Sequence, residues 1–277
     1  MLVSVVIPTC HRNNLLAKCL DRLAPGQQTL PPERYEVIVT DDGSKSDTSA
    51  MVETHYPWVR WVQGPRKGPA ANRNNGARHA QGEWLAFTDD DCLPDEGWLD
   101  AFLHSIGKDI LVYEGKTTCL DGVSSPLEHS PTNLSGGFLW SCNMMIEKKL
   151  FQKIAGFDEG FPFAHLEDVE LRERVTQYSK FIFVPDALVD HPPRILPAGS
   201  EMGASHESDV YYACLKQKTS AISVELELLK NIVLARGRAI WHCPISLDSF
   251  KAIHSLCVEL WVVILNYSIW WRRHSKT

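Results

Sequence analysis

The N-terminal third of the chain alternates short apolar, β-branched runs with helical segments, and each apolar run ends in polar residues. The runs are Val3 to Ile7, Tyr35 to Thr40, Trp58 to Val62 and Trp84 to Thr88. Apolar residues at helical spacing separate the first two runs, and a small-residue helix precedes the fourth. Strands that alternate with helices need crossover connections, which build a mainly parallel sheet with helices on both faces. The sequence therefore predicts an α/β fold.

Acidic residues directly follow two of these predicted strands. Asp41 and Asp42 follow the second strand, and Asp89, Asp90 and Asp91 follow the fourth. Ligands of parallel sheets bind outside the carboxyl ends of the strands, so we expect these carboxylates at a binding edge. Three adjacent carboxylates repel one another unless a cation compensates, and carboxylate oxygens suit Mg²⁺ or Mn²⁺. A solvated turn that caps the next helix is the alternative interpretation.

Four further polar residues lie where they can add to such a site. Arg73, in a predicted helix, can pair with a phosphate or with an aspartate. Glu167 and Asp168 begin another helix, where the helix dipole favours acids without any catalytic role. The aromatic segment GFDEGFPFAH precedes them and would bury a carboxylate, raising its pKa toward that of a general base. His191 comes after the last predicted strand, Phe181 to Val184, and a metal role for it requires Asp91 nearby.

Composition and charge exclude several classes of protein. Twenty-eight basic and 34 acidic residues give a net charge of −6, and no Lys/Arg run exceeds a pair, which argues against nucleic-acid binding. With 277 residues and 44% hydrophobic residues, the chain is neither disordered nor a disulfide-stapled miniature fold. The eight cysteines show no metal spacing, and the N-terminal apolar run lacks signal-peptide features. We therefore expect reduced, mostly buried thiols and a cytoplasmic location.

The last third of the chain has only helical patterns. The segment Ser255 to Trp271 carries one charge, Glu259, and Arg272 and Arg273 follow it. Its 17 residues are at the short limit for a membrane span, and a glutamate makes crossing costly. Two alternatives remain: an interfacial helix with tryptophans at the headgroups of the inner membrane face, or a helix packed back on the protein.

Five motifs together resemble, in order and spacing, the inverting GT-A glycosyltransferases of family 2. They are SVVIPTCHR, VIVTDDGSKSDT, GPAANRNNGARHAQGEWLAFTDDDC, SCNMMIEKKLFQKIAGFDEGF and EDVELRERV. The resemblance covers about residues 2 to 195, and implies a GT-A, Rossmann-like domain over residues 1–196 with a helical C-terminal region over 197–277. It also implies a nucleotide diphosphate sugar donor, Mn²⁺ or Mg²⁺ on the diphosphate, and a glycan or lipid-linked acceptor.

The resemblance also implies roles for individual residues. The donor-binding set comprises Pro8 and Thr9 beside the nucleoside, Asp41 or Asp42 on the base, and Arg73, Asp89 and Asp90. Asp91 is the expected direct metal ligand, with Asp89 and His191 completing the metal set. Asp168 matches the base that deprotonates the acceptor hydroxyl. The predicted acceptor or sugar pocket contains Asn143, Met144 and Glu167.

The chain departs from the family pattern at two places. Thr88 stands where the family commonly has a hydrophobic residue, and Glu147 or Lys148 stands where it usually has an arginine. The second departure leaves the charge of the acceptor side open. Two other functions remain: a sugar nucleotidyltransferase, although PTCHRNN lacks the glycines of its usual phosphate loop, and a non-catalytic module that binds a nucleotide sugar.

Overall fold

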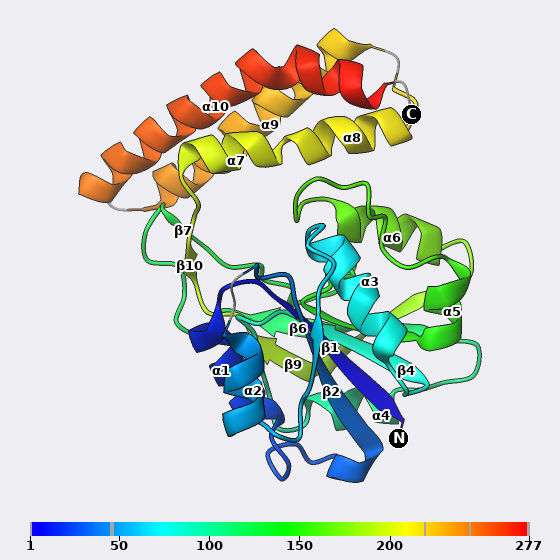
Figure 1. Cartoon of the computed structure of the whole chain (residues 1–277). Coiled ribbons are helices and arrows are strands. Elements are labelled where there is room, and N and C mark those ends of the chain that lie inside the picture. Colours follow the sequence, from blue (N-terminus) through cyan, green and yellow to red (C-terminus); the bar gives the residue numbers. More distant parts are fainter. Residues whose placement is uncertain (1, 45–46, 219, 244, 276–277) are drawn as a thin grey trace. The chain divides into compact units, whose positions relative to one another are not determined.

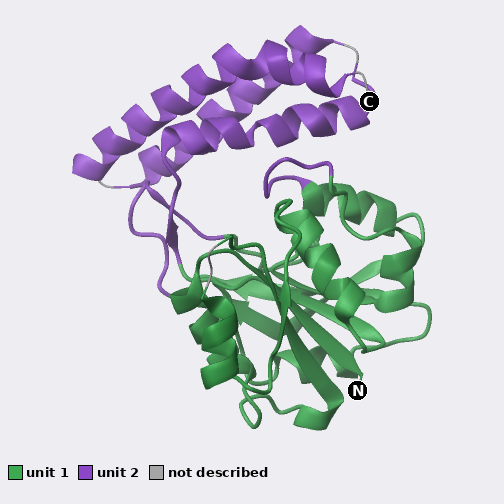
Figure 2. Cartoon of the chain, in the orientation of Figure 1, with its two compact units in different colours: residues 1–120, 131–159, 167–192 green, residues 121–130, 160–166, 193–277 purple. Residues whose placement is uncertain are grey.

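The computed structural model describes residues 2–44, 47–218, 220–243 and 245–275 (Figure 1). The chain forms two compact units (Figure 2). Residues 1–120, 131–159 and 167–192 form the sheet unit, and residues 121–130, 160–166 and 193–277 form the helical unit. The predicted boundary after residue 196 stays a prediction, and the two early segments of the helical unit have no counterpart in it.

An eight-stranded mixed sheet forms the sheet unit, in the order β3-β2-β1-β4-β8-β6-β9-β5. Neighbours are parallel except where β8 pairs with β4 and β6 and where β5 pairs with β9. This confirms the predicted mainly parallel α/β sheet. The strands are β1 (Val3–Thr9), β2 (Tyr35–Asp41), β3 (Arg60–Gln63), β4 (Trp84–Thr88), β5 (Leu93–Pro94), β6 (Val112–Thr118), β8 (Asn143–Glu147) and β9 (Phe181–Asp190).

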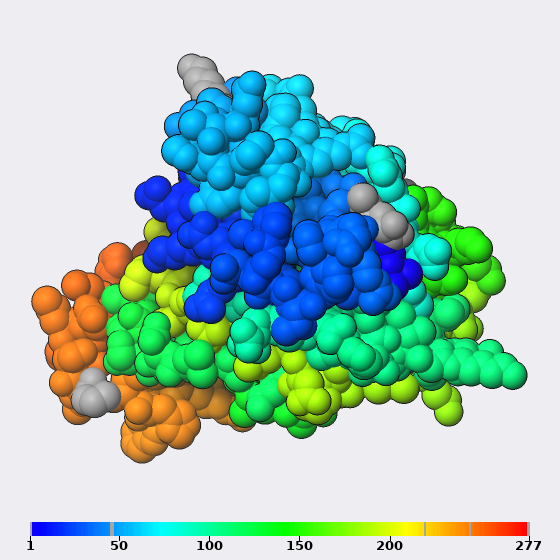
Figure 3. Space-filling model, turned by 90° about the horizontal axis from the view of Figure 1, so that it is seen from below, coloured from blue at the N-terminus to red at the C-terminus, as the bar shows by residue number. Residues whose placement is uncertain are grey.

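Two hydrophobic cores lie on the two faces of this sheet, because successive strand residues point to opposite faces. Val5 and Ile7 face a core shared with α1 (Asn13–Leu23), α2 (Thr48–His55) and α4 (Trp98–His104). Val6 and Phe87 face a second core shared with α3 (Pro69–His79), α5 (Lys148–Lys153) and α6 (Glu167–Val175). A short 3₁₀ helix, Pro32–Arg34, leads into β2. Figure 3 shows the N-terminal residues, in blue and light blue, forming one continuous surface.

Strand register brings the predicted site residues to one edge of the sheet. Thr9 pairs with Asp41, and Thr88 pairs with Asn143. β6 and β9 run parallel to β4, since both partners of β8 oppose it, so Asp190 also ends at this edge. Glu147 instead pairs with Trp84 at the opposite edge. Glu147 thus lies at the other end of β8 from Asn143, away from the edge where the acids after β2 and β4 gather.

The strands differ from the prediction most clearly at β9, which was expected only over Phe181 to Val184. The strand continues to Asp190 because residues 185–187 form a bulge: Val184 pairs with Gly115 and Leu188 pairs with Lys116. Pro185 lacks a backbone N–H and is tolerated in a strand only where it leaves the ladder, as in this bulge.

The eight cysteines are all free, as expected. Only Cys19, Cys92 and Cys142 are buried, however, so the expectation that most of them are buried is wrong.

The helical unit contains four helices and a two-stranded ribbon among its described residues. Its core includes Val210, Leu228, Ile232, Val263 and Tyr267. The C-terminal helix covers 28 residues, more than the apolar segment expected from the sequence, and Ser246 and Ser249 form a capping box at its start. The elements are α7 (Gly199–Ser205), α8 (Glu207–Leu215), α9 (Ala221–His242), α10 (Leu247–His274), β7 (Glu128–His129) and β10 (Arg194–Ile195).

Candidate active site

The three consecutive acids after β4 have three different environments. Asp89 accepts a hydrogen bond from Arg73 Nη2 at 2.7 Å. Asp90 has no exposed surface and accepts from Thr9 Oγ1 at 2.6 Å and from Arg12 Nε at 3.1 Å. Asp91 accepts from Arg12 Nη1 at 3.0 Å. The two arginines therefore supply the positive charge that three adjacent carboxylates require.

These environments separate the acids electrostatically. Burial raises the pKa of Asp90 to about 7, although Arg12 and Thr9 favour its ionised form. Burial also acts to raise the pKa of Asp89, but the charge and the hydrogen bond of Arg73 outweigh it and hold that pKa below its usual range. Asp89 is therefore ionised at neutral pH, whereas Asp90 is an internal acid that links β1 and the loop after β4.

Asp91 and His191 lie together, as a shared metal role requires. The distance from Asp91 Oδ1 to His191 Nε2 is 3.5 Å, and both side chains are buried. Ligand atoms of Asp91, Cys92 and His191 all lie within 4.8 Å of one another. Burial raises the pKa of the Cys92 thiol well above its usual range, so this residue remains a neutral thiol. Carboxylate oxygen and imidazole nitrogen remain, and they fit Mn²⁺ or Mg²⁺.

Asp168 stands at the start of α6 with one carboxylate oxygen in use. Its Oδ2 accepts from the backbone N–H of Ser141 at 3.2 Å, and its buried Oδ1 has no hydrogen-bond partner among the residues that the structure describes. Burial, followed by the charge of adjacent Glu167, raises the pKa of Asp168 to about 7. Glu167 itself is buried and pairs with Arg73 Nη1 at 3.1 Å. Arg73 thus joins the helix of the predicted base to the acids after β4.

The aromatic residues that precede Asp168 were expected to form one apolar wall, but they belong to two different units. Phe157 lies under Arg73, with its ring centroid 5.6 Å from the guanidinium carbon. Phe161 belongs to the helical unit and contacts the ring of Tyr211 in α8. Asn74 of α3 accepts from Phe157 N at 2.9 Å and donates to its carbonyl oxygen at 2.8 Å, which fixes the first turn of this segment.

The acids after β2 organise the neighbouring loops. Asp41 is buried and accepts from the backbone N–H of Gly43, as in an Asx turn. Asp42 accepts from the backbone N–H groups of Arg66 and Gly68 at 2.8 and 3.1 Å. Burial nevertheless raises the pKa of Asp42. Pro8 and Thr9 lie beside them at the buried end of β1.

Asn143 and Met144 have structural roles that the sequence did not indicate. Asn143 Nδ2 donates to the carbonyl oxygens of Lys116 and Ala187, and its Oδ1 accepts from Trp98 Nε1 at 2.8 Å. These contacts tie β8 to β6, β9 and α4. Met144 has no exposed surface and lies in the core beneath α5 and α6. The structure offers no support for placing either side chain in an acceptor or sugar pocket.

Three important residues escaped the sequence prediction. Arg12 pairs with Asp90 and Asp91 from the loop after β1. Asn72 joins α3 to β2 through its hydrogen bonds with Thr40. Glu114 is buried and accepts from Asn133 Nδ2 and from the backbone N–H groups of residues 137–139. Of these three, only Glu114 gave a signal in the sequence, because a charged residue within an apolar strand is unusual.

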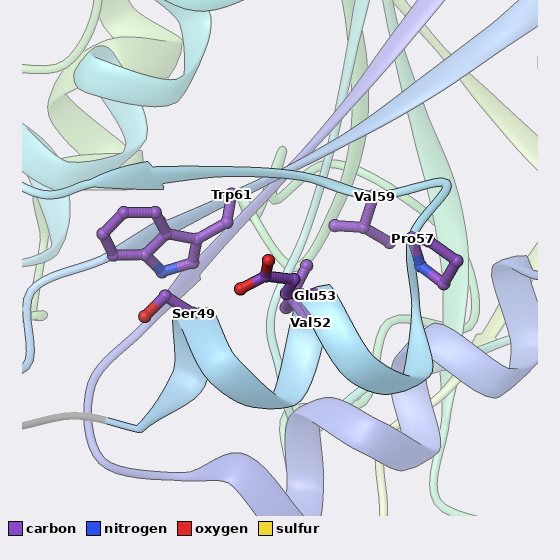
Figure 4. A pocket seen from close by; sticks show the side chains of 6 residues that line it. All are labelled: Ser49, Val52, Glu53, Pro57, Val59 and Trp61. Atoms are coloured by element: carbon purple, nitrogen blue, oxygen red, sulfur yellow. The ribbon is translucent and has the colours of Figure 1, made fainter.

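A separate hollow lies between α2 and β3 (Figure 4). Ser49, Val52 and Glu53 line it from α2, and Trp61 lines it from β3. Pro57 and Val59 complete the lining, and none of these six residues belongs to the predicted site.

A mostly parallel sheet with flanking helices and a helical extension is also the architecture of solved GT-A glycosyltransferases. A mannosyltransferase from Pyrobaculum calidifontis, solved with GDP-Man and Mn²⁺, aligns over 99% of this chain and 86% of its own, with a TM-score of 0.57 and 17% identity. The model of the family described as "Glycosyl transferase family 2" matches residues 4–155, more than half of the chain. The chain therefore belongs to glycosyltransferase family 2, as its motifs predicted.

Curated relatives include glycosyltransferase AglE of Haloferax volcanii, which is 34% identical over 108 residues, 38% of this chain and 35% of that protein. Validoxylamine A glucosyltransferase of Streptomyces hygroscopicus subsp. limoneus is 28% identical over 217 residues, 63% of this chain and 48% of that protein. The chain thus spans about a third to a half of the length of these two relatives.

Proposed function

We propose that this chain is a metal-dependent, inverting glycosyltransferase that moves a sugar from a nucleotide diphosphate sugar to an acceptor hydroxyl. The observation that carries the proposal is the contrast between two acids in the sheet unit. Asp91 lies beside His191 and Arg12, as suits a residue that faces a cation and a diphosphate. Asp168 has a free buried oxygen and a pKa raised to about 7, as suits a general base.

Asp91 and His191 would hold Mn²⁺ or Mg²⁺. The bound ion would neutralise the charge that develops on the leaving diphosphate. Asp89 is a weaker candidate for direct ligation, because its Oδ1 is engaged by Arg73. Arg12 would add a second positive charge near the diphosphate. Buried Asp90 would hold Arg12 and Thr9 in place through an ion pair and a hydrogen bond.

Asp168 would accept the proton of the acceptor hydroxyl. As that proton leaves, the acceptor oxygen forms a bond to the anomeric carbon, and the bond from this carbon to the diphosphate breaks with its electron pair. The attack comes from the face opposite the diphosphate, so the configuration inverts. The backbone N–H of Ser141 orients the carboxylate, and Arg73 holds neighbouring Glu167 in place.

The nucleoside would lie beside Pro8 and Thr9, where Asp41 or Asp42 can accept from an N–H of the base. Asp42 already accepts from two backbone N–H groups of the loop after β3, so it would shape that side of the nucleoside pocket.

The acceptor would be a glycan or a lipid-linked hydroxyl compound, and the reaction would take place in the cytoplasm. Glu167 would lie on the acceptor side, held in place by Arg73.

Two substitutions test the proposal. With a donor found by thermal shift against nucleotide diphosphate sugars and Mn²⁺, Asp168→Asn should lower kcat about 10²- to 10⁴-fold without changing donor affinity. Asp91→Ala should abolish the Mn²⁺ dependence of nucleotide diphosphate binding, and Asp186→Asn, on the exposed bulge of β9, serves as the control. Full activity of Asp168→Asn would refute the base assignment, and unchanged Mn²⁺ dependence in Asp91→Ala would refute the metal assignment.

A further inference from the structure

The C-terminal helix α10 has two faces of different character. One face is buried against the other helices of the helical unit and includes Ala252, Glu259, Val263, Tyr267 and Trp270. The opposite face is exposed, and its apolar residues recur at three- and four-residue spacing. We call them the apolar stripe: Phe250, Ile253, Trp261, Ile264, Leu265 and Ile269. Trp261 is 62% exposed and Leu265 is 56% exposed, so the stripe is a free surface of this chain.

Charge is confined to the two ends of this exposed face. Glu259 is the only Asp, Glu, Lys or Arg between Lys251 and Arg272, and it points into the helical unit. There its carboxylate contacts His206 Nε2 at 2.9 Å and Arg236 Nε at 3.4 Å. The stripe therefore carries no Asp, Glu, Lys or Arg along its length, with Arg272 at one end and Lys251, ion-paired to Asp248 at 3.1 Å, at the other.

The connection between α9 and α10 extends the apolar surface. Trp241 is 86% exposed, Ile245 is 91% exposed and Leu247 is 70% exposed. With Phe250 they form what we call the apolar tip. The exposed side chains of Arg238, His242 and Lys251 are close to the tip along the chain. Large apolar side chains with basic neighbours are the composition of helices that lie in a membrane interface.

We propose that the apolar stripe and the apolar tip dock on a lipid bilayer that contains anionic lipids, with α10 lying in the plane of the headgroups. The tryptophans would sit at the headgroup level, and the exposed Arg238 and Arg272 would pair with anionic lipids. This surface would hold the chain where a lipid-linked acceptor is present. That last step rests on the proposed function, whereas the docking itself does not.

A membrane-spanning arrangement fits the contacts of α10 less well. The helix is long and apolar enough to cross a bilayer by length and composition, with a mean hydropathy of 1.5 in its most apolar window. However, Glu259 is ion-paired within the helical unit, and Tyr267 donates to the carbonyl oxygen of Ala221 at 2.7 Å. Insertion across the bilayer would break these contacts and expose a carboxylate to hydrocarbon.

A second copy of the chain fits the charge pattern less well than lipid does. In a two-fold antiparallel pairing of two stripes, Lys251 of each copy would lie near Arg272 of the other, and a parallel pairing would place each residue beside its own counterpart. The parallel arrangement brings like charges together, and the antiparallel one places Arg272 beside a Lys251 that Asp248 already neutralises. Anionic headgroups complement both Arg272 and the exposed Arg238.

Flotation of the purified full chain with lipid vesicles tests the proposal. The protein should float with vesicles of phosphatidylcholine and phosphatidylglycerol, and at least about tenfold less with phosphatidylcholine alone or in high salt. The double variant Trp261→Glu/Leu265→Glu should lose flotation by a similar factor. Leu120→Glu, which changes an equally exposed apolar residue of the sheet unit, should float like the native chain. Brominated lipids should quench the tryptophan fluorescence of the native protein, which tests docking without any substitution.

Each contrary outcome refutes the proposal. Absence of flotation with anionic vesicles and of quenching excludes lipid docking, and a dimer in ultracentrifugation that Trp261→Glu/Leu265→Glu dissociates would assign the stripe to a second copy. Asp168→Asn separates the two proposals, because it should lower the rate of sugar transfer about 10²- to 10⁴-fold and leave flotation unchanged. A chain that floats but transfers no sugar would retain the docking surface and lose the proposed function.

Discussion

At the scale of single residues, the site is organised by where its positive charges lie. Arg12 accompanies Asp90 and Asp91, and Arg73 lies between Asp89 and Glu167. Asp168 is the acid whose free oxygen contacts neither arginine by a hydrogen bond or ion pair among the described residues. Because burial then dominates, its pKa rises to about 7, and this carboxylate can change protonation state near neutral pH with an oxygen available to an acceptor.

The raised pKa of Asp168 predicts a pH-dependent cost to stability. The folded state favours the protonated carboxyl, so its contribution to stability is complete below the unfolded pKa of about 3.8 and is lost as pH rises through about 7. Asp168→Asn has no such ionisation. We expect the variant to exceed the native chain in free energy of unfolding by at least about 1 kcal/mol near pH 8, as measured by urea denaturation.

The difference should shrink near pH 4, where Asp168 is protonated in the folded state and the cost of burying its charge is absent. A difference of equal size at both pH values would attribute the effect to packing and contradict the ionisation account. Asp186→Asn is again the matched control, because that carboxylate is exposed on the bulge of β9.

Sequence patterns predict those residues of the site that follow the end of a strand. The proximity of Asp91 and His191 follows from two strands ending at one edge. Arg12 could not be predicted, because a lone arginine in a loop has no periodicity that indicates its partner. Asn143 and Met144 were assigned by motif, whereas the antiparallel pairing of β8 places their side chains among buried contacts. That pairing depends on distant parts of the chain.

At the scale of elements, helical and strand periodicity predicted most of the segments and few of their ends. β4 has the predicted bounds because apolar residues and polar neighbours change abruptly there. β9 exceeds its prediction because a bulge accommodates Pro185, which single-strand patterns do not reveal. α10 exceeds the apolar segment because its first two turns combine polar and apolar residues on a capped start.

The ion-paired cluster that joins α8, α9 and α10 predicts a strong effect of one substitution. Glu259→Leu would leave Arg236 and His206 charged in the core of the helical unit. Removing one member of such a buried group typically costs about 3–5 kcal/mol. We therefore expect early loss of helix signal in circular dichroism during thermal unfolding, and substantial recovery when Arg236→Leu and His206→Leu are added.

The pKa of His206 makes the stabilisation by this cluster depend on pH. Burial would lower the pKa of His206, but its hydrogen bonds to Asp209 and Glu259 outweigh burial and raise the pKa to about 9. The stabilisation is therefore complete below the unfolded pKa of about 6.5 and is lost as pH rises through about 9. A Glu259→Leu chain that unfolds like the native one at neutral pH would show that the cluster contributes little.

At the scale of the whole molecule, neither unit is one continuous stretch of the sequence. Residues 121–130 and 160–166 leave the sheet unit and join helices that follow much later in the sequence. β7 pairs with β10, and His165 lies 3.1 Å from Asp209 in α8. The segment 160–166 ends directly before Glu167, and Leu166 has a φ of 70°, a left-handed conformation that leucine rarely adopts. The helical unit therefore constrains the chain just before the helix that carries Asp168.

This connectivity predicts the result of a simple truncation. A chain that ends at Pro192 keeps residues 121–130 and 160–166 but removes their partners, including Tyr211 for Phe161 and Asp209 for His165. We expect it to melt below the native chain and to exchange backbone amide hydrogens faster over 160–166. Tyr211→Ala, which removes only the ring partner, should produce a smaller change of the same kind. If the truncated chain keeps the native melting temperature and the native exchange over 160–166, those segments do not depend on the C-terminal helices, and residues 1–192 fold as an autonomous domain.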